Sequence, residues 1–133
     1  MKTKLMVVAA AGLLLTAVPM WAHHAFAAEF DQDKPIKVQG TVTKWELTNP
    51  HSWIHIDVKD ADGKQVTWMI EGASPNNLYR LGLTKESLPA GSEITVEGYR
   101  AKDGSTRAVG RNITFANGKT FFLGLTEAER APK

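Results

Sequence analysis

All four histidines of this 133-residue chain fall in two short stretches. His23 and His24 are adjacent near the start of the chain, and His51 and His55 lie four residues apart further along. Imidazole nitrogen is a common ligand of transition metals, and copper has the highest affinity for nitrogen donors among the divalent ions. If the chain is cut before His23, the α-amine and imidazole of that residue form a chelate, which His24, His51 or His55 could complete. The histidines therefore predict a metal site, with copper as the preferred ion.

Side chains near the second histidine pair extend this candidate site. Alternate residues of a strand face the same side, so Trp53, His55 and Asp57 would lie opposite the apolar residues 54, 56 and 58. Met69 and Glu71, on the next strand, would share this outer face. We predict metal ligands at His23, His24, His51 and His55, and a ligand-binding surface formed by Trp53, Met69, Glu71 and Asp57. The alternative interpretation is that these polar groups are ordinary surface residues and that a loop or helix covers the indole.

The sequence gives little support for catalysis. Asp57 and Glu71 could flank a substrate as a carboxylate pair, but outward carboxylates are usually solvated. Ser52 and Ser74 have no evident base, and the scattered glycines form no phosphate-binding loop. The absence of cysteine excludes thiolate metal sites, a cysteine nucleophile and disulfides. We predict a binding protein without catalytic residues, not an enzyme, and keep a small hydrolase as an alternative.

Residues 1–22 have the pattern of a secretory signal peptide. Lys2 and Lys4 precede an apolar run over residues 5–18, which is shorter than the roughly 20 residues of a membrane span. No twin-arginine pair is present, which favours the general secretory route. We place the cleavage after Ala22, although cleavage after Ala27 also fits the small-residue rule. The mature protein is therefore predicted to be periplasmic and to lack a transmembrane anchor.

The predicted mature chain is neutral apart from its histidines. The whole chain has 16 Lys plus Arg and 14 Asp plus Glu, and loss of Lys2 and Lys4 leaves 14 of each sign. Proteins that bind nucleic acid normally carry a basic surface, so we expect no nucleic-acid partner. The remaining partners are a metal ion or small ligand or, alternatively, a periplasmic protein that docks on the outer face around Trp53.

Alternating apolar residues predict a small all-β fold with one short helix. Strands are expected near residues 38–47, 53–58, 66–71, 94–96, 109–115 and 120–123. The alternation in the first strand holds only if one residue is skipped near Lys44, which indicates a β-bulge. Ser74 and Pro75 favour a helix start, and Gly82 favours its end.

Three strands, a helix and two or three further strands are the order of an OB-fold, a Greek-key barrel. We therefore predict an OB-like barrel of five to six strands over residues 36–124, with a β-sandwich as the alternative. Residues 23–35 are predicted to be a lead-in and residues 125–133 a flexible tail.

Several short motifs recur together in one family of secreted bacterial proteins. They are His23-His24-Ala25-Phe26 before Phe30-Asp31, Gly40-Thr41-Val42, Thr48-Asn49-Pro50-His51-Ser52-Trp53, Trp68 with Glu71, and Ser74-Pro75-Asn76 with Arg80-Leu81-Gly82. Through this combination, between His23 and Thr114, the chain resembles DUF6152, a family of unknown function. The resemblance implies a periplasmic protein with an OB-like barrel and no established activity, so it assigns no site residues. Ala25 stands where the family usually has serine.

Overall fold

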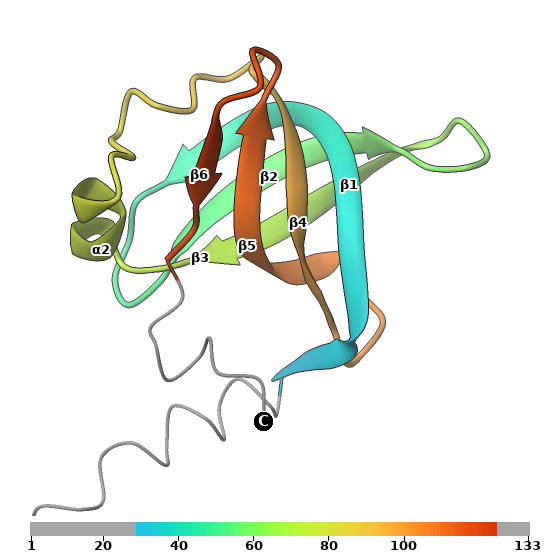
Figure 1. The fold of residues 1–133 in the computed structure, drawn as a ribbon. Helices are drawn as coiled ribbons and strands as arrows, with labels where there is room; N and C mark the ends of the chain where they lie inside the picture. Colours follow the sequence, from blue (N-terminus) through green and yellow to red (C-terminus); the bar gives the residue numbers. More distant parts are fainter. Residues whose placement is uncertain (1–28, 125–133) are drawn as a thin grey trace, which may run out of the picture.

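Six strands and one short helix are described between residues 29 and 124 of the computed structural model (Figure 1). The strands are β1 (Phe30–Glu46), β2 (Ser52–Lys59), β3 (Gln65–Gly72), β4 (Glu93–Ala101), β5 (Arg107–Phe115) and β6 (Thr120–Phe122). Helix α2 (Pro75–Arg80) lies between β3 and β4. Among these residues, no helix has the length and apolar character needed to cross a membrane.

The strands close into a barrel through the long strand β1 and one parallel strand pair. The first part of β1 pairs with β4 and its last part pairs with β2, while β2 pairs with β3 and β4 pairs with β5. β3 and β5 then pair in parallel, which closes the ring, and β6 pairs with the second half of β5. A five-stranded ring of this order, with a helix between its third and fourth strands, is an OB-like barrel. The predicted fold is confirmed, and the alternative of a β-sandwich is wrong.

The start of β1 differs from the predicted boundary at residue 36. The strand begins at Phe30, whose side chain is buried against Ala101 and Val109. Residues 31–35 are polar or proline, and the register with β4 is irregular between Phe30 and Pro35, so no alternating pattern marks this part of the strand. The predicted lead-in over 23–35 is therefore wrong for residues 30–35. The predicted tail over 125–133 lies outside the described residues.

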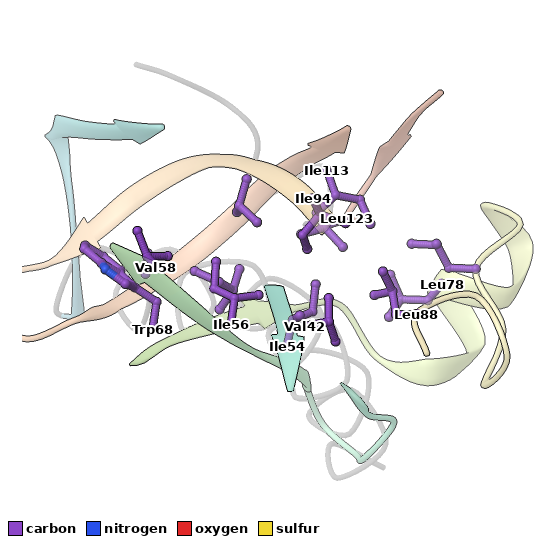
Figure 2. Packing of buried hydrophobic residues seen from close by; sticks show 14 of the residues in the cluster. Val42, Ile54, Ile56, Val58, Trp68, Leu78, Leu88, Ile94, Ile113 and Leu123 are labelled. Carbon is purple, nitrogen blue, oxygen red and sulfur yellow. The ribbon is translucent and has the colours of Figure 1, made fainter. Parts of the chain in front are cut away.

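Apolar side chains from alternate strand positions fill the barrel (Figure 2). Leu78 of α2 and Leu88 cover one end of this core, whereas Val58 and Trp68 lie at the opposite end (Figure 2). The register of β1 with β2 shifts between Val42 and Lys44, which confirms the predicted bulge. The bulge bends β1, so that its first part pairs with β4 and its last part pairs with β2.

Candidate functional site

Three rows of side chains cross the outer face of β1, β2 and β3. In register order, the rows are Glu46, Trp53 and Glu71; Lys44, His55 and Met69; and Thr41, Asp57 and Thr67. Directly opposed Cβ atoms in such rows are about 4.5–5.5 Å apart, so the members of a row can touch. Trp53 is half-buried between two glutamates, and the register places it on the same face as the predicted ligand-binding residues of β2 and β3.

His51 lies immediately before β2 and turns its imidazole onto β3. Its Nδ1 contacts Oε1 of Glu71, a glutamate that is only 7% exposed, while the His51 side chain is 42% exposed. An ionised carboxylate only accepts hydrogen bonds, so Nδ1 donates to Glu71, and in the neutral tautomer that this contact selects Nε2 carries the lone pair. His51 is therefore oriented by a buried carboxylate, and its other ring nitrogen is left as an acceptor or metal ligand.

His55 is held by a different carboxylate on the opposite neighbouring strand. Its Nε2 lies 2.8 Å from Oε2 of Glu46, and Oε1 of Glu46 lies 2.6 Å from Nζ of Lys44. The hydrogen bond from Lys44 and then the one with His55 lower the pKa of the Glu46 carboxyl below its usual value. Both carboxylate oxygens of Glu46 are thus occupied, and His55 belongs to this ion-pair network.

The structure does not bring His51 and His55 together. The two residues are four positions apart, which is about 13 Å along a strand, and they turn to opposite neighbours. Within residues 29–124, no group of three or more histidine or carboxylate side chains is arranged to hold a metal ion. His23 and His24 lie outside the described residues. A metal site at His51 would therefore need donors from elsewhere in the chain.

Replacing Glu46 with glutamine is expected to flatten the acid dependence of stability. The pKa of Glu46 is below its ordinary value of 4.5 in the folded protein, so its contribution to stability is complete above pH 4.5. That contribution is lost as the pH falls through the lowered folded-state pKa. We expect E46Q to be less stable than the wild type at pH 7 and to lose less stability on acidification, measured by urea unfolding at each pH. E93Q, at an exposed position of β4, is the control, and an E46Q profile parallel to that of the wild type would contradict the assignment.

Asp57 and Glu71 do not form a catalytic pair. The Asp57 carboxylate accepts hydrogen bonds from Nε2 of Gln65 at 2.6 Å and from Oγ1 of Thr67 at 2.8 Å. Its row is four residues from the row that contains Glu71, so the two carboxylates are about 13 Å apart along the sheet. Glycosidases use separations of about 5 to 9.5 Å. The geometry therefore gives no support to the alternative of a small hydrolase.

The start of the described chain lies on the same outer face, one strand beyond β3. Phe30 packs on Val109 of β5, and Val109 is the register partner of Glu71. Arg107, two positions earlier on β5, lies 3.9 Å from the carboxylate of Glu29 and 5.6 Å from the ring of Phe30. The packing of Phe30 on β5 was not predicted from the sequence, although a single phenylalanine within a polar stretch is a pattern that indicates a buried anchor. The described part of the chain therefore begins one strand away from Glu71 of the candidate site.

Comparison with known proteins gives a family, and solved structures that are only distantly similar. The crystal structure of a mitochondrial single-stranded DNA binding protein from S. cerevisiae has 16% sequence identity and a TM-score of 0.47, covering 62% of this chain and 94% of that chain. No curated protein matches the sequence. The model of a family of unknown function, DUF6152, matches residues 10–111, which is most of the chain. This match agrees with the motifs between His23 and Thr114, and the chain belongs to the DUF6152 family.

Proposed function

We propose that this chain is a secreted, periplasmic binding module that holds a copper ion on the outer face of its barrel, beside Trp53. The ligands are the α-amine and imidazole of His23, the imidazole of His24 and Nε2 of His51. Met69 is 38% exposed, but it is the register partner of His55 and lies as far along the sheet from His51 as His55 does, so we leave it out of the ligand set. His55 is left out as well, because it lies about 13 Å along the strand from His51 and its carboxylate partner, Glu46, is shared with Lys44.

The contact between His51 and the buried carboxylate of Glu71 carries this proposal. Metal-binding histidines usually donate their second ring N–H to a carboxylate, which fixes the ring and raises the basicity of the coordinating nitrogen. A surface histidine without such a role does not need a carboxylate that is withdrawn from solvent. The buried Glu71 is therefore the feature that distinguishes His51 from an ordinary exposed histidine.

The length of chain before Glu29 supports the participation of the two N-terminal histidines. Arg107, which pairs with Glu29, is the register partner of Met69 on β3. The path from Arg107 to Glu71 has two steps. The step from β5 to Met69 on β3 is one strand spacing of about 4.8 Å, and the step along β3 from Met69 to Glu71 is about 7 Å. The five or six residues from Glu29 back to His24 or His23 can span up to about 17–20 Å when extended. This reach is longer than the two steps across the sheet combined, which supports a place for the N-terminal imidazoles near His51 in the proposal.

Copper titration of the mature protein, followed by tryptophan fluorescence, tests the proposal. Stoichiometric Cu(II) bound at His51 should quench the emission of Trp53, and the W53F variant should lose most of the copper-dependent signal. E71Q, which removes the charge that orients His51, is expected to weaken Cu(II) binding by about 10- to 100-fold, and H51A by at least as much.

H55A is the matched control for these variants, because it removes a second imidazole from the same face. We expect H55A to bind Cu(II) with the wild-type affinity. Wild-type affinity in H51A, or an equal loss in H51A and H55A, would contradict the assignment of His51 as a copper ligand.

A further inference from the structure

A second concave site lies at the end of the barrel opposite α2. Residues of β1 up to Thr41 pair with β4, and from Thr41 onward β1 pairs with β2. The β2–β3 hairpin projects beyond the barrel on the side of the earlier part of β1 (Figure 1). A cleft of about 1090 Å³ opens between residues 37–41 of β1 and the hairpin. This volume is slightly above the range of about 300–1,000 Å³ that is usual for small-molecule sites.

The floor of the cleft is apolar. It is formed by Val38 of β1, Val58 and Val66 of the hairpin, and Trp68. Figure 2 shows Val58 and Trp68 together at this end of the core. Val38 and Val66 are only half-buried, so apolar surface remains accessible inside the cleft. An apolar chain or ring placed there would remove this surface from water.

Arg100 supplies a fixed positive charge next to that floor. Its guanidinium lies 5.3 Å from the ring centroid of Trp68, while Nη2 donates to the carbonyl oxygen of Gly104 at 2.6 Å and Nε donates to that of Ser105 at 3.1 Å. Within residues 29–124, Arg100 makes no ion pair with a carboxylate. Two of its five N–H groups are used on carbonyls, so three remain for an anion.

No acidic residue that the structure describes around the cleft forms an ion pair with Arg100. Asp103, on the turn after β4, interacts with it only at longer range, since hydrogen bonds from Ser105 and, more weakly, the attraction of Arg100 lower the pKa of the Asp103 carboxyl. Asp57 accepts hydrogen bonds from Gln65 and Thr67, and Oδ1 of Asp60 accepts the backbone N–H groups of residues 62 and 64. Glu93 is exposed on the rim. A planar guanidinium that is held by stacking and by two carbonyls is well suited to bidentate binding of a carboxylate.

We infer that this cleft binds an amphipathic carboxylate, with its acid group on Arg100 and its apolar part along Val38, Val58 and Val66. The site is separate from His51, which does not line the cleft. The protein would thereby bind two chemically different ligands at separate places on one barrel.

Calorimetric titration with octanoate, and with 1-octanol as the uncharged match, tests this inference. We expect the wild type to bind octanoate more tightly than 1-octanol, and R100Q to lose about 10- to 100-fold in octanoate affinity, the effect of removing one charged hydrogen-bonding partner. R100K should recover part of the loss because it keeps the charge. R80Q on α2, which removes an arginine far from the cleft, and H51A should both bind octanoate like the wild type.

Equal affinity for octanoate and 1-octanol in the wild type would overturn the role of Arg100, and so would equal octanoate affinity in R100Q and R80Q. Absence of octanoate binding to the folded wild type would overturn the site as a whole. The comparison of the two probes on the wild-type protein decides the matter even if R100Q does not fold.

Discussion

Gly40→Ala is expected to lower the free energy of unfolding by about 3 kcal/mol or more, the upper range for forcing extra volume into a packed position. A Cβ at this position would lie 2.4 Å from the carbonyl oxygen of Asp57 and 2.9 Å from Cγ2 of Val58. The first of these atoms belongs to the backbone of β2, so it cannot move without shifting the strand. Gly40 lies where β1 passes from β4 to β2, and the clash would therefore loosen the closure of the barrel.

Urea unfolding of G40A beside G72A measures this effect with a matched control. Gly72 also lies in a strand, but the nearest atom to a Cβ built there is 3.7 Å away, which is an ordinary contact. Both variants change the conformational freedom of the unfolded chain equally, so their difference reports the clash alone. Similar unfolding midpoints for G40A and G72A would show that β1 and β2 do not approach each other as closely as the structure indicates.

Adding the dipeptide Gly-Pro before His23 of the mature protein is expected to weaken Cu(II) binding by about 100-fold, which corresponds to about 2.8 kcal/mol. The addition converts the α-amine of His23 into an amide and so destroys the chelate formed by the amine and the imidazole. Proline has no backbone N–H, so the new N-terminal amine cannot build a replacement chelate through successive deprotonated amide nitrogens, as it could after addition of a single glycine. All side chains of residues 29–124 stay the same, so the melting temperature of the copper-free protein should not change.

Gly-Pro added after Lys133 is the control for this variant, because it has the same composition and leaves the α-amine of His23 free. Affinities are compared by competition with a chelator that binds Cu(II) at known strength. If the two extended proteins bind Cu(II) equally well, the N-terminal amine is not a ligand.

Much of the fold could be predicted from local patterns in the sequence. The alternation of Ile54, Ile56 and Val58 identified β2, and the interrupted alternation around Lys44 identified the bulge. The parallel pairing of β3 with β5 could not be predicted, because it joins segments about 40 residues apart and depends on how the whole barrel closes. The first residues of β1 were missed because their polar side chains face solvent and only Phe30 is buried.

The candidate site was predictable in its composition but not in its contacts. Strand periodicity is sufficient to place Trp53 and His55 on one outer face. Periodicity does not determine that His51 contacts Glu71 whereas His55 contacts Glu46. These partners depend on the register of β2 with two different neighbouring strands, β3 and β1. The stacking of Arg100 on Trp68 was likewise hidden, because it joins β4 to the inner face of β3.

Native mass spectrometry of the protein purified from the periplasm tests the copper site most directly, because one spectrum gives both the first residue of the mature chain and the mass of any bound ion. The account predicts a chain that begins at His23 and carries one copper ion, which is released on acidification as its imidazole ligands become protonated. A chain that begins at Ala28, or one that begins at His23 and stays metal-free when equimolar copper is added, would contradict it.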